Sequence, residues 1–291
     1  MLSTRAQKIK ASFPPKPAGF AGDPESILAG RRAWDEQCEP IGPGVFREDQ
    51  TRPFYYLIHP AFVNVAILYA HGGGFTEGSA RTHQHLCKAI SKTAHACVYN
   101  VEYSLAPEAT YPVALDEFCE LYRRVRDKHA AIYFAGDSAG ACLVMQAMLK
   151  LMSSGETEKI NGIVLISPWL DLDAQKHKHS LRDGADPLVT YDALKGCAGL
   201  YLAGTDATDP AISPSFAKNQ PFPSTLILVG SDEILLDDTL EFYENNKSTS
   251  QIELAIYEGM WHVWPGWLDL EESQRAIKQI GDFVKQHVER N

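Results

Sequence analysis

The chain has 291 residues, of which 45% are apolar and 22% charged, a composition typical of a globular protein and unlike that of a disordered or fibrous one. Its 37 acidic residues outnumber its 27 Lys and Arg residues and give a formal net charge of −10. Such a chain is a poor candidate for binding nucleic acid or an anionic membrane, and its length allows one large domain or two small ones.

Neither the N-terminal residues nor the cysteines indicate a secreted or membrane protein. Residues 1–17 lack the apolar segment of a signal peptide, and no uncharged apolar run reaches about 18 residues, so we expect no span of a bilayer. The six cysteines show no C-x-x-C spacing and lie mostly in apolar stretches, which favours buried, reduced thiols over a zinc or redox site. We therefore expect a cytoplasmic protein.

Strands and helices are predicted to alternate from residue 54 onward. Runs of β-branched, aromatic and other apolar residues predict strands at 54–58, 65–69, 96–101, 131–135, 162–166, 226–229 and 252–257. Apolar residues at helical spacing predict helices at 82–94, 113–128, 139–153, 236–246 and 272–288, and a shorter one at 26–38. This alternation predicts an α/β fold, in which a mostly parallel sheet carries helices on both faces.

One connection is too long for this pattern. From Trp169 to about Pro223 there is no clear strand, and the segment is rich in Asp, Pro, Gly and Ala. Some fifty residues is far more than the few residues that usually join a strand to the next element. The segment is therefore predicted to be an inserted helical cap or lid.

The sharpest motif is Gly136-Asp137-Ser138-Ala139-Gly140, which follows one predicted strand directly and begins a predicted helix. This is the G-x-S-x-G nucleophile elbow, a strained turn that points a serine hydroxyl out of the sheet. Small residues on either side of Ser138 leave the room that this turn needs. The pattern predicts that Ser138 is a catalytic nucleophile.

A second motif, His71-Gly72-Gly73-Gly74-Phe75, follows the strand predicted at 65–69. Successive glycines let backbone N–H groups face one point without interference from side chains. The N–H groups of Gly72, Gly73 and Ala139 are predicted to form an oxyanion hole. A phosphate-binding loop is the alternative, but the Gly-Lys-Ser/Thr of a P-loop and the G-x-G-x-x-G pattern are both missing.

The remaining catalytic groups are sought after the last two predicted strands. Asp232, in Gly230-Ser231-Asp232-Glu233, is predicted to orient the catalytic histidine, in preference to Asp237 and Asp238, which fall in the first turn of the next helix. His262 is predicted to accept the proton of Ser138 and return it to the leaving alcohol. The chain order Ser, Asp, His is that of the α/β-hydrolases.

The sequence resembles the hormone-sensitive-lipase-like branch of the α/β-hydrolases, which includes bacterial carboxylesterases and arylacetamide deacetylases. The resemblance runs from about residue 50 to the end of the chain and is carried by HGGGF at 71–75, YSLAPE at 103–108, GDSAG at 136–140, SPWLD at 167–171 and GSDE at 230–233. It implies one domain over residues 1–291, with an eight-stranded, mostly parallel sheet and a cap built from about 1–48 and 169–218.

The chain departs from the family pattern at two places. Ser104 stands where the family commonly has Arg, an exchange also found in the branch similar to monoterpene lactone hydrolases and small acetyl esterases. The acid motif does not have the other common family form, Asp-Pro-Leu, and the identity of the acid is therefore less secure than that of the nucleophile.

The resemblance and the motifs together predict a serine carboxylesterase that acts on short- to medium-chain esters, or on lactones, through an acyl-enzyme. Phe75, Trp169 and Trp264 are expected to line an apolar substrate pocket. No metal or organic cofactor is implied, because the His83/His85 and His177/His179 pairs have no third ligand nearby.

An amidase or deacetylase would use the same groups. A hormone receptor of this fold would lack the histidine that His262 supplies. Family members often dimerise, so a homodimer is a further expectation.

Overall fold

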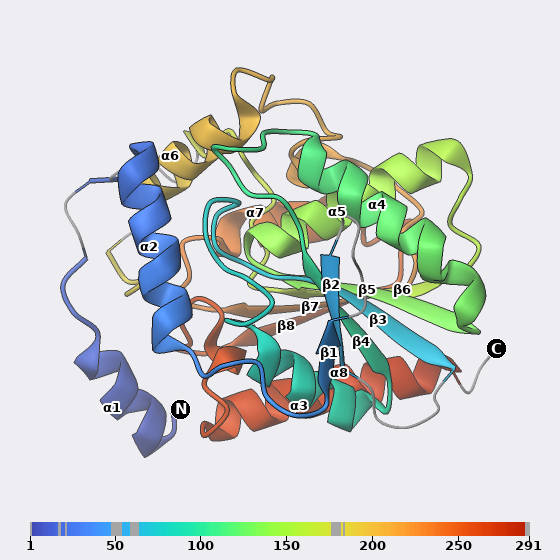
Figure 1. Cartoon of the computed structure of the whole chain (residues 1–291), viewed down its shortest axis with the longest axis horizontal. Coiled ribbons are helices and arrows are strands. Elements are labelled where there is room, and N and C mark those ends of the chain that lie inside the picture. The colour runs from blue at the N-terminus through green and yellow to red at the C-terminus, as the bar shows by residue number, and fades with distance from the viewer. Residues whose placement is uncertain are drawn as a thin grey trace.

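The computed structural model describes residues 2–16, 19, 20, 22–47, 54–58, 64–175, 182 and 184–288 (Figure 1). Its strands form one eight-stranded sheet in the order β1-β2-β4-β3-β5-β6-β7-β8. The strands are β1 (Val45–Arg47), β2 (Phe54–Ile58), β3 (Val65–Ala70), β4 (Cys97–Glu102), β5 (Ala131–Asp137), β6 (Ile160–Ile166), β7 (Thr225–Gly230) and β8 (Ile252–Tyr257). The seven predicted strands are all present, each within two residues of its predicted ends.

The sheet is mostly parallel, as predicted. Strand β2 pairs antiparallel with β1 and with β4, and every other neighbouring pair is parallel. The strand that sequence analysis missed is β1, which is only three residues long and leaves Phe46 57% exposed. So short an edge strand has no alternation of apolar and polar residues to reveal it.

Helices cover both faces of the sheet (Figure 1). Helices α3 and α8 lie together on one face, and α4, α5 and α7 lie on the other. Two buried apolar clusters match these two layers. The helices are α1 (Thr4–Ser12), α2 (Pro24–Gln37), α3 (Gln84–Ala94), α4 (Val113–Val125), α5 (Ala139–Ser154), α6 (Tyr191–Leu202), α7 (Leu236–Asn246) and α8 (Glu271–Val288).

The helix boundaries follow from local chemistry. Helix α2 begins after Asp23, whose side chain accepts the N–H of Ser26, with Pro24 in the first turn where no N–H is needed. Helix α5 ends at Gly155, which adopts the left-handed conformation that closes many helices. None of the helices in the described part of the chain has both the length and the apolar composition needed to cross a bilayer.

The long connection between β6 and β7 contains helix α6 and, among its described residues, no strand, as predicted. The N-terminal helix α1 was not predicted, because its apolar residues are few and Ala6 alone is buried. Helices α1, α2 and α6 lie at the same side of the molecule (Figure 1). They flank the ends of the parallel strands, where the predicted catalytic residues are located.

Candidate active site

Ser138 occupies the sharp turn between β5 and α5. Its backbone has φ 52° and ψ −123°, a conformation that costs free energy for any residue with a side chain. The two glycines of the motif make the turn fit. A Cβ at position 136 would lie 2.6 Å from the carbonyl carbon of Gly140, and one at position 140 would overlap the carbonyl oxygen of Ala70. The elbow therefore requires glycine at both positions, as its sequence pattern indicated.

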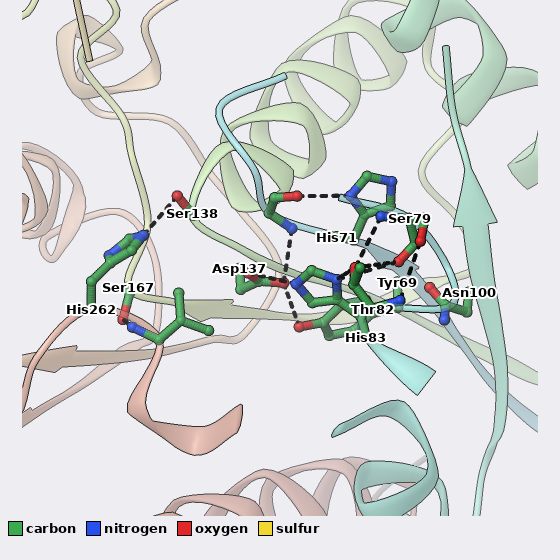
Figure 2. Close-up of polar contacts among 12 residues, drawn as sticks. Tyr69, His71, Ser79, Thr82, His83, Asn100, Asp137, Ser138, Ser167 and His262 are labelled. Atoms are coloured by element: carbon green, nitrogen blue, oxygen red, sulfur yellow. Dashed lines mark hydrogen bonds and ion pairs between the residues drawn. The ribbon is translucent and has the colours of Figure 1, made fainter. Parts of the chain in front are cut away.

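His262 links the Ser138 hydroxyl to a buried carboxylate. Its Nε2 lies 2.9 Å from Ser138 Oγ, and its Nδ1 lies 3.0 Å from Glu233 Oε2. Figure 2 shows the Ser138 hydroxyl directed at the His262 ring. Glu233 is fully buried, and its other oxygen accepts the Gly230 N–H at 2.6 Å and the Ser167 hydroxyl at 2.7 Å. The three side chains form a continuous hydrogen-bonded chain.

The prediction that Asp232 orients His262 is wrong in this geometry. The Asp232 carboxylate instead pairs with Lys10 of α1 and accepts the Ser231 hydroxyl. The two adjacent acids point in different directions from the turn after β7, so that Asp232 is partly exposed and Glu233 is buried. The carboxylate facing His262 is therefore one residue later in the chain than predicted.

Ser167, which follows β6, joins the acid to the histidine loop. Its hydroxyl donates to Glu233 Oε1 at 2.7 Å. The same hydroxyl accepts the backbone N–H of Val263 at 2.9 Å (Figure 2). Val263 has a positive φ of 53°, so the loop that carries His262 turns sharply at this contact. Ser167 thus fixes Glu233 and the histidine loop relative to each other, a role that its position in the SPWLD motif did not reveal.

The electrostatics of the pair favour a charged histidine. Burial lowers the pKa of His262, but the hydrogen bond and the charge of Glu233 outweigh it, so that the pKa is raised above its usual value. Burial raises the pKa of the Glu233 carboxyl, against the hydrogen bond from His262. Glu233 therefore stabilises the imidazolium that forms when His262 takes a proton.

The glycine loop offers different N–H groups from those predicted. The N–H of Gly72 donates to Asp137 Oδ1 at 3.1 Å, so it does not face the Ser138 hydroxyl, and the prediction for Gly72 is wrong. Gly73 and Gly74 line the same cavity as Ser138, and both have positive φ. Ala139, the first residue of α5, presents an N–H without an intrahelical partner at the positive end of the helix.

A buried polar network lies beneath this loop (Figure 2). Besides the Gly72 N–H, Asp137 accepts the Tyr69 hydroxyl at 2.7 Å and lies 3.3 Å from His83 Nε2. Burial raises the pKa of Asp137, but His83 outweighs it and the net shift is downward. Burial lowers the pKa of His71 to about 3, so this ring is neutral and stacks on Tyr103. Asp137 thereby holds the loop from below.

Ser138 and His262 open into a cavity of about 570 Å³, which is within the usual range for small-molecule sites. Trp169 lines it, as predicted. Phe75 does not, because it is buried in a stack on Tyr201 with ring centroids 3.7 Å apart. Most of the lining was not predicted. It comes from the residues before α2 and from α2 itself, from the turn after the glycine loop, from α6 and the loop before it, and from the end of the histidine loop: Phe20, Trp34, Thr76, Glu77, Leu188, Val189, Ala193, Leu194, Cys197 and Trp267.

Trp264 is also a corrected prediction. It is fully buried and packs against Tyr257, with ring centroids 4.9 Å apart, so Trp267 lines the cavity in its place. Trp264 begins a short 3-10 turn that directs its ring into the core below the sheet edge. Three tryptophans at close spacing cannot be ranked from sequence, because the direction of each ring depends on this turn.

Two other groups noted in the sequence have structural surroundings. Glu108 pairs with the Arg31 guanidinium through both oxygens, at 2.6 and 2.8 Å, which ties α2 to the loop after β4. Within the described ranges, no three His, Cys, Asp or Glu side chains come together in a way that could hold a metal ion. His177 and His179 lie outside those ranges.

Comparison with known proteins agrees with this geometry. A family model described as the alpha/beta hydrolase fold matches residues 67–266. An acetyl-hydrolase of Streptomyces hygroscopicus is 34% identical over 224 residues, which cover 75% of each chain. An esterase of Acinetobacter venetianus is 33% identical over 226 residues, which cover 75% of this chain and 74% of the relative.

Solved structures extend the likeness to nearly the whole chain. A crystal structure of an esterase/lipase from an uncultured bacterium has a TM-score of 0.89 and 29% identity, and covers 98% of this chain and 99% of its own. A hormone-sensitive lipase from a metagenome library has a TM-score of 0.87 and 29% identity, with 98% and 97% covered. The chain therefore belongs to the hormone-sensitive-lipase-like branch of the alpha/beta hydrolase family and is a carboxylic-ester hydrolase.

Proposed function

We propose that this hydrolase cleaves short- to medium-chain carboxylic esters, lactones included, through an acyl-enzyme formed on Ser138, with His262 as general base and Glu233 as the acid that orients it. The observation that carries the proposal is the continuous chain from Ser138 Oγ through His262 to Glu233 Oε2, with contacts of 2.9 and 3.0 Å. A nucleophile bonded to a base that is itself held by a third group is the arrangement that activates a serine.

In the first half of the reaction, Ser138 Oγ attacks the ester carbonyl carbon and its proton passes to His262 Nε2. The negative charge that develops on the carbonyl oxygen is held by the backbone N–H groups of Ala139, Gly73 and Gly74. His262 then gives the proton to the departing alkoxide. In the second half, water attacks the acyl-enzyme with His262 as base, and the acid leaves as Ser138 recovers its proton.

Of the two predicted cap segments, 1–48 and 169–218, the described residues before β1 and those of 169–218 act as a cap over this site within one domain. The cavity that contains Ser138 is lined by Phe20 and Trp34 from the first segment and, from the second, by Leu188, Val189, Ala193, Leu194 and Cys197. The segments also make direct contacts with the core, since Arg31 of α2 donates to the carbonyl oxygens of Thr76 and Ala106. The cap thus sets the size and the polarity of the substrate pocket.

Acyl-chain length tests this function. A cavity of about 570 Å³ whose walls include four aromatic side chains favours small acyl groups. We expect kcat/KM for p-nitrophenyl acetate and butyrate to exceed that for the dodecanoate by about tenfold or more, the effect of a group that a pocket cannot accommodate. A clear preference for the twelve-carbon ester would overturn the short-chain assignment. Hydrolysis of none of these esters would overturn the esterase proposal.

The pH profile of the wild-type enzyme is a second test. His262 must be neutral to accept a proton from Ser138, and Glu233 raises the pKa of His262. Protonation on the acid side therefore removes the base, so activity is lost as the pH falls through this raised pKa. We expect the acid limb of kcat/KM to have its midpoint above about 6.5, the usual value for histidine. A midpoint well below this value in a rate–pH series would contradict the assigned pair.

A further inference from the structure

Glu77 places a carboxylate on the wall of the substrate cavity. It lies in the turn that follows the glycine loop, where its N–H donates to the Gly73 carbonyl oxygen at 2.8 Å. The side chain is partly buried, and among the residues that the structure describes it has no hydrogen-bond donor or ion-pair partner. A carboxylate that is removed from water without a partner is costly, and a bound group that supplies one is correspondingly favoured.

Helix α2 packs closely over this carboxylate. A Cβ at Gly30 would lie 2.5 Å from Glu77 Oε1, so the helix leaves room for the carboxylate only because residue 30 is glycine. Burial raises the pKa of the Glu77 carboxyl, while the charge of Arg31 acts in the opposite direction. Arg31 itself is committed to Glu108 and to two backbone carbonyl oxygens. It holds α2 in place and does not form a hydrogen bond to Glu77.

The ring of Trp34 lines the same cavity one helical turn beyond Gly30. Residues four apart lie on one face of a helix, so Trp34 lies on the same face of α2 as Gly30, against which the Glu77 carboxylate fits. Trp34 also contacts the His83 ring edge-on at 5.8 Å. If the His83 ring is protonated, its positive charge is balanced by the negative charge of the Asp137 carboxylate with which it is paired. Glu77 therefore gives this part of the cavity a net negative charge beside an aromatic ring.

We propose that the cavity accepts esters that carry an ammonium group, which is held by the Glu77 carboxylate and by the ring of Trp34. A carboxylate supplies the opposite charge, and the face of a tryptophan attracts a cation that has been removed from water. The inference rests on the proposed esterase function, because it assigns a substrate class to the cavity of Ser138.

The test compares each cationic ester with a neutral ester of similar shape. For a cation on the alcohol side the pair is acetylcholine and 3,3-dimethylbutyl acetate, and for a cation on the acyl side it is p-nitrophenyl 6-aminohexanoate and heptanoate. For each pair the measured quantity is kcat/KM of the cationic ester divided by kcat/KM of the neutral ester. We expect Glu77→Gln to lower this ratio by roughly tenfold to hundredfold in at least one pair, which is the range for contacts to charged groups. Trp34→Leu should lower the same ratio by about threefold to tenfold.

Glu120→Gln is the matched control, since it removes one negative charge from an exposed position on α4 and should leave both ratios unchanged.

The wild type alone supplies a further measurement that does not depend on how a variant folds. If the preference lies on the alcohol side, choline should inhibit hydrolysis of p-nitrophenyl butyrate more strongly than 3,3-dimethylbutanol does. If it lies on the acyl side, 6-aminohexanoate should inhibit more strongly than heptanoate does.

Two failures can be told apart. If p-nitrophenyl butyrate is hydrolysed but both ratios are the same in wild type and Glu77→Gln, the ammonium inference is wrong and the esterase function stands. The same conclusion follows if neither cation inhibits better than its neutral counterpart. If the wild type hydrolyses no ester, the proposed function fails, and the inference fails with it.

Discussion

Ser138→Ala is expected to reduce hydrolysis of p-nitrophenyl butyrate by about 10⁶-fold, the loss that follows when the nucleophile of such a triad is removed. The Ser138 hydroxyl is the atom that His262 contacts at 2.9 Å, and alanine leaves nothing there to form the acyl-enzyme. The oxyanion donors and the cavity remain in the variant. A small residual rate above that in water is therefore expected from them alone.

The variant should fold normally. The backbone N–H of Ser138 donates to the Ile166 carbonyl oxygen, and its own carbonyl oxygen accepts from Ala141, Cys142 and Trp169, so main-chain bonds hold the strained turn. Alanine keeps the Cβ and loses only the hydroxyl. We expect the thermal unfolding midpoint to remain close to that of the wild type.

Parallel assays and labelling test this expectation. An organophosphate should label the wild type at Ser138 and fail to label the variant. Ser153→Ala, which changes an exposed serine at the other end of α5, should retain full activity and serves as the control for handling and purity. Turnover of Ser138→Ala at the wild-type rate would show that another group is the nucleophile.

Most of the fold could be predicted because each long strand or helix has a pattern of apolar residues within its own segment of the sequence. Strands such as 54–58 and helices such as 236–246 were predicted with the boundaries that the structure has, since each buries a periodic apolar face. The two elements that were missed, β1 and α1, are short and bury little surface of their own. Their positions depend on contacts with distant residues, such as those of Ser3 with Glu272, which no local pattern encodes.

The sequence predicted the motifs that form the site, but not which N–H groups and which carboxylate of those motifs face Ser138 and His262. Ser138 and His262 are each the one residue of the required type in their motifs, and the structure brings them together. Gly72 and Asp232 were predicted at positions that have a direct neighbour of the same chemical type, Gly73 and Glu233. Which glycine N–H faces the cavity depends on backbone angles such as the φ of 115° at Gly73. Sequence patterns carry no such information about direction.

The choice between the two adjacent acids leads to the second large expected effect. Glu233→Gln should lower kcat/KM by about 10³–10⁴-fold, as in triads whose acid is replaced by its amide. Glu233 Oε1 accepts two hydrogen bonds, from Gly230 N–H and Ser167 Oγ, so the oxygen of a glutamine amide will occupy that position. Its NH₂ group then faces His262 Nδ1 and donates to it.

This donation would reverse the tautomer of the histidine. With Nδ1 accepting, the proton of a neutral His262 is carried on Nε2, the atom that must take the proton of Ser138. The amide also lacks the charge that raises the pKa of His262, so the acid limb of any residual activity should move to lower pH. Rate–pH series for wild type and variant measure both effects.

Asp232→Asn is the matched control for this variant, because it makes the same chemical change one residue earlier. It weakens the partly exposed ion pair with Lys10, which contributes about 1 kcal/mol or less to the free energy of unfolding. We expect its kcat/KM to remain within about threefold of the wild type, as for changes away from the reacting groups. A large loss in Asp232→Asn with little loss in Glu233→Gln would restore Asp232 as the catalytic acid. The opposite result would show that the direction of a side chain, and not its place in a motif, decides which acid serves the histidine.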